Sequence, residues 1–462
     1  MSAGHVVIVG SNSGSADTLL TANPQITWFK DTFKRYSNFA MYMSSSNFNA
    51  VKQNGGEKVK IQVTHEMDLL GPQFARITMG VLGGPAANWT ICAPCRGFAD
   101  AYLKQVTAEI GHQQVAQYSK HVAAMHYHLV EGAEHKKILD ELVPWEQSNQ
   151  IRSHYGVAAA DGANVSFWSP LRFWWSDSSS QYLPMVSMQY HNLSITLDLD
   201  TLDNTLECAP SGVPAADTTI TSGGTQYNLT TPTVELMSTC VLLDTAERQK
   251  FSSLNACCAG GEVADSLEYL VGQHQEKAGT PITGTATGAA GATTLFTNHP
   301  VSEVVSMFQN SANETKAAAG WTAGAANSAD PLNYTCHTHT SAIVGGAGSV
   351  KGDSVKSLDL KLNNHTCYDY TKSDPKYFRL VQPLLFHQGA PDDMLYCMSH
   401  SLNPDDADQP SGSANYSRID NVEISYTTAN GANGVVMNPY IISRNYNVFR
   451  VTAGLGGMIF HS

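Results

Sequence analysis

The chain has 462 residues, of which 27 are basic and 40 acidic, so its formal net charge is −13 at pH 7. This charge argues against a nucleic-acid binder that works through a basic surface. The hydrophobic fraction of 42% excludes disorder as the state of the whole chain. At about 150 residues per domain, the length indicates two or three domains. Only 15% of the residues are charged, against about 25% in an ordinary soluble domain.

No segment has the pattern of an export signal or of a membrane span. The first twenty residues lack a basic start, and the apolar run His5–Val9 is too short for a signal core. No apolar stretch approaches the roughly 18 residues that a membrane span needs. The nine cysteines are odd in number and thinly spread, which fits a reducing compartment. We therefore expect the protein to be made and folded in a cytoplasm.

Alternation of apolar and polar residues dominates the chain. It predicts half-buried strands at residues 59–63, 193–199, 358–362 and 422–426. Turn sequences separate them, such as Asp161-Gly162 and Asn430-Gly431. The sequence therefore predicts an all-β protein.

Helical patterns are few and short. Glu134–Leu142 places three apolar residues on one face before Pro144 ends the segment. Asp244 and Glu247 resemble a capping box that opens a short helix through Phe251. We expect neither helix to build a layer of its own.

Composition divides the chain into two parts. The charge-poor segment Pro210–Pro232 is typical of a linker, and strand character returns at Val234. Ala278–Thr297 and Gly320–Asp330 are rich in small residues, and we expect them to be long exposed loops on the second part. A weak sequence similarity between Pro170–Phe173 and Pro383–Phe386 suggests two related halves.

Several short motifs imitate catalytic or ligand sites. The run Val6–Gly14 resembles a nucleotide loop but lacks the second glycine and a following helix. Cys92 and Cys95 form a single C-x-x-C with no second pair to complete a zinc site. We therefore expect a terminal arm at the first segment and ordinary turn cysteines at the second.

Histidines and carboxylates give two further candidates. His126 and His128 would share one face if they lie on a strand, and His121 and His135 are near them, but we expect packing or surface residues rather than a metal site. The pairs Asp392-Asp393 and Asp405-Asp406 could suggest a glycosidase. Catalytic carboxylates must face each other across a substrate, so we interpret both pairs as solvated turn residues. We predict no catalytic, cofactor-binding or metal-binding residues.

The chain also contains N-x-S/T sequons. Because it is rich in Asn, Ser and Thr, their number is close to what chance would give. Without a secretory route we expect them to be unused. They lie at Asn88, Asn192, Asn228, Asn333 and Asn415.

Segments along the whole chain resemble the major capsid proteins of nucleocytoplasmic large DNA viruses, the group that includes iridoviruses and chloroviruses. Near the start, Asn23–Lys30 and Arg35–Phe39 resemble the family's N-P-x-I-T-x-F-K and R-x-T-N-F motifs. Glu109-Ile110-Gly111 resembles its E-I-G-G turn, where His112 replaces a glycine. A turn with positive φ at this position would strain His112.

Further matches follow along both parts of the chain, and the C-terminal third carries the most distinctive of them. They extend to residue 460 in the family's order, which makes the resemblance specific as a set. The matching segments are Pro170–Trp174, Leu183–Val186, Gln189–His191, Leu243–Phe251, Glu268–Gln275, Tyr377–Arg379, Gln382-Pro383, Gln409–Gly412, Asn415–Asp420, Asn445–Val448 and Gly454–Gly457.

The resemblance implies two tandem eight-stranded jelly rolls with a few short helices and long loop insertions. The expected divisions are an N-terminal arm at residues 1–22, a first jelly roll at 23–209, a linker at 210–232 and a second jelly roll at 233–462. It further implies a homotrimer of hexagonal outline that tiles the icosahedral shell of a large double-stranded DNA virus. We expect the Gly/Ala/Thr-rich insertions on the outer surface and the arm on the inner face, in contact with minor capsid proteins.

The function that follows is a structural capsid protein of the virion without catalysis or cofactor, with no direct contact to nucleic acid, assembled in the host cytoplasm. Two alternatives remain. One is a minor or vertex capsid protein of the same fold. The other is a carbohydrate-binding β-sandwich, suggested by the aromatic residues between Phe167 and Trp175, although Pro170 and the apolar neighbours favour core packing there.

Overall fold

The structure is a computed structural model that describes residues 23–31, 33–48, 56–79, 89–143, 145, 165–210, 232–253, 266–314, 331–334, 353–368, 374–389, 391, 393–406, 408–429 and 434–460. Met1–Asn38 is one unit and Phe39–Ser462 is a second, compact unit, which we call the body. Within the first unit, the backbone N–H of Phe29 donates to Thr27 Oγ1 over 3.4 Å. The predicted nucleotide-loop imitation at residues 6–14 lies outside the described residues.

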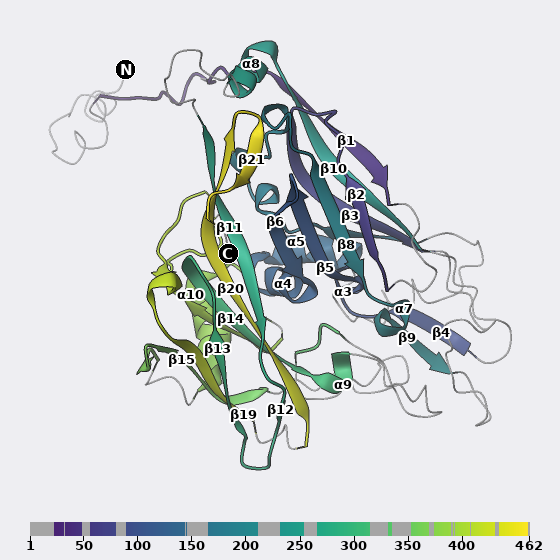
Figure 1. The fold of residues 1–462 in the computed structure, drawn as a ribbon, viewed down its shortest axis with the longest axis vertical. Coiled ribbons are helices and arrows are strands. Elements are labelled where there is room, and N and C mark those ends of the chain that lie inside the picture. The colour runs from purple at the N-terminus through teal and green to yellow at the C-terminus, as the bar shows by residue number, and fades with distance from the viewer. Residues whose placement is uncertain are drawn as a thin grey trace, which may run out of the picture. The chain divides into compact units, whose positions relative to one another are not determined.

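The first half of the body is a sandwich of two four-stranded antiparallel sheets (Figure 1). One sheet has the order β1-β10-β3-β7 and the other the order β2-β8-β5-β6. A separate two-stranded ribbon pairs β4 with β9. The strands are β1 Phe39–Asn47, β2 Lys58–Gln62, β3 Leu69–Met79, β4 Trp89–Pro94, β5 Leu103–Ile110, β6 Gln113–Ser119, β7 Val165–Pro170, β8 Leu193–Leu199, β9 Leu206–Pro210 and β10 Thr233–Leu243.

The second half repeats this arrangement. Its sheets have the orders β11-β20-β14-β17 and β13-β19-β15-β16, with β12, β18 and β21 added at the margins of the first. Counted along the chain within each half, and leaving out the additional strands, both halves read 1-8-3-6 and 2-7-4-5. The strands are β11 Leu267–Ala278, β12 Ile282–Thr283, β13 Ala290–Leu295, β14 Pro300–Asn310, β15 Val355–Leu362, β16 His365–Thr366, β17 Leu395–Ser399, β18 Ala414–Asn415, β19 Val422–Thr428, β20 Val436–Thr452 and β21 Leu455–Met458.

Two sheets that pack with this strand order form a jelly roll, so the body is a double jelly roll, as predicted. Below, the halves are called the first and second roll. The four predicted strands at residues 59–63, 193–199, 358–362 and 422–426 correspond to β2, β8, β15 and β19. In β8 and β19 each buried residue alternates with a half-buried one, which is the alternation visible in the sequence.

Short helices occupy the connections between strands. In both rolls, helical turns fill the connection between the fifth and sixth strands: α4, η1 and α5 in the first roll, and η6 and α10 in the second. The predicted helices at Glu134–Leu142 and Asp244–Phe251 are confirmed as α5 and α8. The helical elements are α3 Phe98–Tyr102, α4 Lys120–Met125, η1 His126–Val130, α5 Ala133–Leu142, η2 Trp174–Ser176, η3 Ser179–Gln181, η4 Met185–Ser187, α7 Leu202–Thr205, α8 Thr245–Ser253, α9 Ser311–Glu314, η6 Tyr377–Val381, α10 Gln382–Phe386 and η7 Tyr416–Arg418.

The expected start of the second roll at residue 233 is wrong. β10 pairs with β1 on one side and with β3 on the other, so it is the eighth strand of the first roll. Its alternate side chains, including Val234, Leu236 and Cys240, lie in the first roll's core. Residues 211–231, most of the predicted linker, lie outside the described residues. The boundary between the rolls therefore falls after Leu243, because the eighth strand of a jelly roll returns to pair beside its first.

The segment Ala278–Thr297 is also not the long loop that its composition suggests. It contains β12 and β13, and β13 pairs with β19 over six residues from Ala290 to Leu295. Thr293 and Leu295 are buried in this strand. The other predicted loop, Gly320–Asp330, lies outside the described residues.

The two halves share one topology, but the similar segments Pro170–Phe173 and Pro383–Phe386 do not occupy equivalent places in it. The first segment follows the sixth strand of its roll, β7, whereas the second lies in α10, before the sixth strand of its roll. The sequence similarity of these two segments therefore does not reflect the relationship between the halves. The repeated strand order is the observation that carries the relationship.

The turn between β5 and β6 has the strain expected of its sequence. Gly111 and His112 both have positive φ, 56° and 68°. Two consecutive residues of this kind suit the tight hairpin turns whose twist matches that of the strands. His112 adopts a conformation that costs a non-glycine residue free energy, so the turn is strained at this position, as predicted.

Candidate functional site

Among the described residues, the two rolls meet in an extensive buried contact. The β11-β20-β14-β17 sheet is covered on both faces, and β14 shows this most clearly. Val304 and Phe308 lie in the core of the second roll, while Val305 and Met307 lie in a core that is continuous with the first roll. The two rolls therefore share one apolar interface and form a single body.

Polar groups from both rolls meet at one end of this contact. The Arg96 guanidinium donates to Asp393 Oδ1 over 3.2 Å and also pairs with Asp393 Oδ2. It reaches the carbonyl of Leu332 over 2.5 Å, and His128 Nε2 lies 3.6 Å from Asp393 Oδ2. Burial alone would raise the pKa of Asp393, but Arg96 and His128 beside it hold that pKa well below its ordinary value. This carboxylate stays ionised inside the contact.

A second buried cluster lies within the second roll. His387 pairs with Glu303 through Nε2 and with Asp405 through Nδ1, each over 3.1 Å. Arg444 lies 3.5 Å from each of the same two carboxylates, which closes a ring of four alternating charges. All four side chains are at most 8% exposed.

The ring determines the protonation of its members. Burial would lower the pKa of His387, but the charge of Glu303 and the bond to Asp405 raise it to about 12. Burial would raise the pKa of Glu303, but His387 and Arg444 lower it to about 2. The imidazolium form has both nitrogens available as donors, which matches its two carboxylate partners.

The predicted histidine cluster is divided by the structure. His126 and His128 do not share a strand face, because they lie in the π-helical turn η1. His121 stacks on Tyr440 of the second roll at 3.9 Å between ring centroids, and His126 Nε2 lies 3.3 Å from His274 Nε2. His135 is exposed and lies 3.4 Å from Glu131. The buried histidines are thus packing residues of the roll contact.

Burial keeps the contact histidines neutral. It lowers the pKa of His121 and His126 well below the usual range and, with the charge of Arg444, lowers that of His274 to about 3. Among the described residues, no three His, Cys, Asp or Glu side chains are arranged to hold a metal ion.

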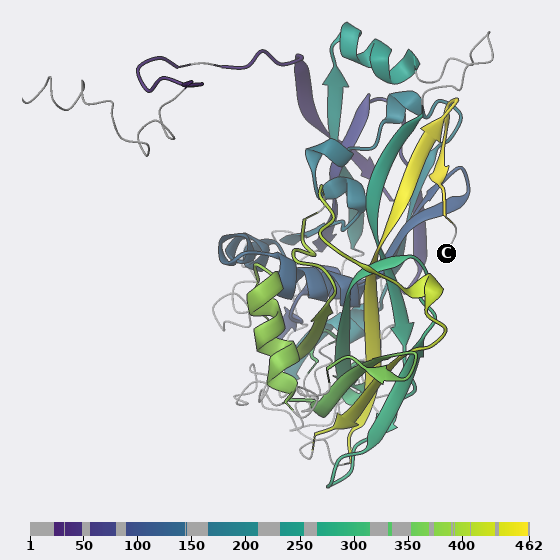
Figure 2. The ribbon, with the colours of Figure 1, turned by 90° about the vertical axis from the view of Figure 1, so that its left-hand side faces the viewer.

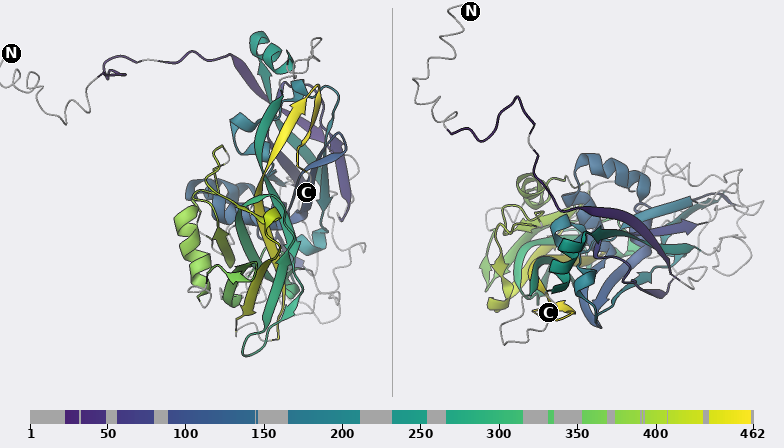
Figure 3. Two further views of the ribbon diagram at one scale, coloured as in Figure 1. Left: turned by 60° about the vertical axis from the view of Figure 1, so that its left-hand side comes forward. Right: turned by 90° about the horizontal axis from the view of Figure 1, so that it is seen from above.

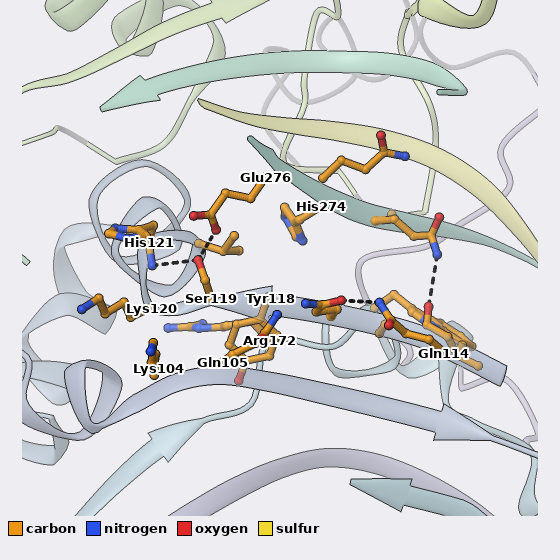
Figure 4. Close-up of a pocket in the computed structure, with 18 of the residues that line it drawn as sticks. Lys104, Gln105, Gln114, Tyr118, Ser119, Lys120, His121, Arg172, His274 and Glu276 are labelled. Carbon is orange, nitrogen blue, oxygen red and sulfur yellow. Dashed lines mark hydrogen bonds between the residues drawn. The ribbon is translucent and has the colours of Figure 1, made fainter. Parts of the chain in front are cut away.

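A polar cleft of 820 Å³ opens along the roll contact, between the edge strands β6 and β11 (Figure 4). Side-chain hydrogen bonds cross it: Gln273 donates to the carbonyl of Val115 over 3.1 Å, and Ser119 donates to Glu276. Burial raises the pKa of Glu276, while Ser119 and Lys120 oppose that rise. The cleft is a hydrogen-bonded seam between the rolls.

The prediction that both carboxylate pairs are solvated turn residues is wrong in part. Asp406 caps a turn by accepting from the backbone N–H of Asp408, as a solvated turn residue does. Asp393 and Asp405 are instead buried in the two charged clusters described above. Their partners lie far away in the sequence, so no local pattern could have revealed them. Asp392 lies outside the described residues.

Other sequence candidates have ordinary roles. Cys92 lies in the strand β4 rather than in a turn, and Cys95 directly follows that strand and is buried. In the aromatic run, Phe167, Phe173, Trp174 and Trp175 are at most 3% exposed, so they supply core packing rather than a sugar platform. Among the sequons, Asn192 and Asn415 are exposed and Asn333 is buried, whereas Asn88 and Asn228 lie outside the described residues. Within the described residues, no helix has the length and apolarity that a bilayer crossing requires.

Exposed apolar side chains gather at two places on the body. On η6 and α10 of the second roll, Leu384 is 82% and Leu385 61% exposed, and Leu380 and Val381 are also exposed. On β1, an edge strand of the first roll, Met41 and Met43 are about half exposed. Such concentrations are typical of protein contacts. They are the features that sequence patterns missed.

Comparison with known proteins agrees with this architecture. A family model described as "Major capsid protein N-terminus" matches residues 27–244, and one described as "Large eukaryotic DNA virus major capsid protein" matches residues 263–457. The two matched ranges divide the chain after β10, where the structure divides it.

Individual relatives cover almost the whole chain. The major capsid protein of Phaeocystis pouchetii virus is 25% identical over 97% of this chain and 98% of its own length. That of Paramecium bursaria Chlorella virus 1 is 27% identical over 97% of each. A chain of the solved PBCV-1 virus capsid is similar with a TM-score of 0.70 and 23% identity, over 94% of this chain and 100% of its own. The Faustovirus major capsid protein gives a TM-score of 0.65 with 13% identity over 96% of each chain.

The repeated strand order, the shared core and these matches define a double jelly-roll capsid protein. The chain belongs to the family of large eukaryotic DNA virus major capsid proteins. It is a structural protein of the viral capsid, which confirms the predicted family, fold and structural role.

Proposed function

We propose that three copies of this chain form a homotrimer of hexagonal outline, and that such trimers tile an icosahedral shell. The observation that carries this proposal is the repetition of one strand order in both rolls. Because the rolls are alike in topology, three chains supply six similar lobes, which can fill a hexagonal outline around a three-fold axis.

The surface chemistry supports assembly. Only 15% of the residues are charged, and long-chain apolar residues are exposed on β1 and on α10. The centre of a protein interface is poor in charge and contains well-packed apolar residues. A net charge of −13 suits a shell that does not contact the viral DNA directly.

The remaining parts of the proposal concern partners and place. We propose that the protein acts without catalysis, that it is assembled in the host cytoplasm, and that residues 1–22 contact minor capsid proteins on the inner face. These residues lie outside the described part of the chain. They precede Asn23, where similarity to the family's opening motif begins.

Light scattering of the purified protein tests the trimer, which should have the mass of about three chains. Electron micrographs should show particles or arrays of hexagonal outline. A monomer that binds oligosaccharides would contradict the proposal, and a low copy number in the particle would favour a minor or vertex protein. Deletion of residues 1–22 should leave the trimer intact and impair shell assembly.

A further inference from the structure

The contact between the rolls uses topologically defined elements on each side. From the first roll it uses the connection between the fifth and sixth strands, α4 and η1. From the second roll it uses the first and eighth strands, β11 and β20. His121 of α4 stacks on Tyr440 of β20, and His126 of η1 contacts His274 of β11.

Each roll contains both kinds of element, so the chain has a second connection of the first kind and a second strand pair of the second kind. In the second roll, the connection between the fifth and sixth strands is η6 with α10. In the first roll, the first and eighth strands are the paired strands β1 and β10. The two sets lie on different sides of the body, with α10 beside the second roll and β1 at the margin of the first (Figures 1 and 2).

Both equivalents are apolar and exposed in the single chain. We call Leu380, Val381, Leu384 and Leu385 the helix face; they are exposed by 45%, 40%, 82% and 61%. We call Met41 and Met43 the strand face; they are exposed by 51% and 50%. Residues at the corresponding place within the chain, such as His121, His126 and Tyr440, are covered by the roll contact.

The pairing of β1 with β10 shows which way the methionines point. Tyr42 pairs with Cys240, which lies in the core of the first roll, whereas Met41 and Met43 pair with Val241 and Thr239. Because alternate residues of a strand point to opposite faces, Met41 and Met43 point away from that core. The second roll buries the equivalent outer side of its sheet through Val305 and Met307, against the first roll.

We infer that the helix face of one copy docks on the strand face of the next copy, and that this contact repeats the roll contact within the chain. This inference rests on the proposed trimer and names the surfaces that form it. The two faces differ from each other, so the contact is head-to-tail, and successive copies close into a ring. The partner is a second copy of this chain, because the internal contact already joins elements of these two kinds. Figure 3 shows the helix of α10 (green) and the strand β1 (purple) in two further views.

Mixing of one-sided variants tests the inference. Leu384→Asp with Leu385→Asp disables only the helix face, and Met41→Asp with Met43→Asp disables only the strand face. Each variant alone should have the mass of one chain in light scattering. An equimolar mixture should form a pair with the mass of two chains, because one intact contact remains and the ring cannot close. Phe296→Asp, a change at a residue that is 82% exposed outside both faces, should leave the trimer unchanged.

The outcomes separate the inference from the proposed function. Variants that remain trimers would overturn the inference and leave the trimer standing. Monomeric variants that do not pair on mixing would overturn it as well, because the two faces would not be partners. A wild-type protein that is itself a monomer would overturn the proposed trimer. Circular dichroism of each variant should match that of the wild type, and pairing on mixing shows independently that both are folded.

Discussion

Arg96 of the first roll and Asp393 of the second roll form a two-pronged ion pair inside the contact between the rolls. Their side chains are 11% and 3% exposed, and they are separated by 297 positions in the sequence. A guanidinium that meets both carboxylate oxygens is oriented as well as neutralised. The pair therefore adds a directional contact to the apolar interface between the rolls.

Replacement of Asp393 by Asn should destabilise the body strongly. The change removes the charge that compensates Arg96, and loss of one partner from a buried pair costs about 3–5 kcal/mol. Denaturant unfolding followed by tryptophan fluorescence measures this loss. The matched control is Glu109→Gln, which breaks the more exposed pair with Lys60 and should cost at most about 1 kcal/mol. Equal effects of the two changes would contradict the role of the buried pair.

The ring around His387 should give the protein a pH-dependent stability on the alkaline side. In the folded state the pKa of His387 is raised to about 12, against about 6.5 in the unfolded chain. Its contribution is therefore complete below about pH 6.5 and is lost as the pH rises toward 12. Between these values the free energy of unfolding should fall by about 1.4 kcal/mol per pH unit.

Glu303 gives the opposite dependence at acid pH. Its pKa is lowered to about 2 in the folded state, so its contribution is complete above about pH 4.5 and is lost as the pH falls toward 2.

Urea unfolding between pH 6.5 and 9 measures the alkaline dependence of stability that His387 causes. His387→Gln should lower the stability at pH 6.5 and flatten this slope. A variant that keeps the wild-type slope would show that another group is responsible.

The buried histidines His121, His126 and His274 should govern the range between pH 6.5 and 4.5. Burial holds the pKa of all three below the unfolded value of about 6.5, so the unfolded chain binds more protons in this range. Stability should therefore fall as the pH falls, by at most about 1.4 kcal/mol per pH unit for each histidine. Arg172 and Arg444 add to the effect, and Glu303 opposes it for His274.

Unfolding midpoints at pH 6.5, 5.5 and 4.5 check this prediction. His274→Gln should reduce the slope of the wild type, because one buried titrating group is removed. His135→Gln changes an exposed histidine on α5 and should leave the slope as it is. An unchanged slope in the His274 variant would place the acid sensitivity elsewhere.

The sequence predicted those strands in which one face is buried and the other is partly open. β8 and β19 alternate in burial along their whole length, and both were predicted within two residues. β14 was not predicted, because ten of its eleven residues are buried and no alternation remains. A strand between two cores has no polar face to reveal it.

The charged clusters could not be predicted for a different reason. Asp393 and Asp405 stand in turn-like sequence, where carboxylates are usually solvated. Their partners Arg96, Glu303 and Arg444 approach them only after the rolls have folded. The local sequence predicts the turn correctly. It cannot show which distant side chains pair with the carboxylates in that turn.

Gly389 offers a test of how closely the rolls approach, because its backbone N–H donates to the carbonyl of Leu129 in the first roll over 2.8 Å. A Cβ atom at this position would lie 2.5 Å from Leu129 O and 2.6 Å from His128 O. Both neighbours are backbone atoms, so relief requires the rolls to separate locally. Gly389→Ala should therefore cost about 1–3 kcal/mol of unfolding free energy.

The matched control is Gly272→Ala in β11, where a Cβ atom would meet nothing within 4 Å. This change should alter the unfolding free energy by less than about 1 kcal/mol, since only the backbone preference of glycine is involved. Denaturant unfolding of the two variants beside the wild type makes the comparison. If Gly389→Ala is as stable as Gly272→Ala, the backbones of the two rolls can move apart without loss, and the roll contact is looser than its hydrogen bond and ion pair indicate.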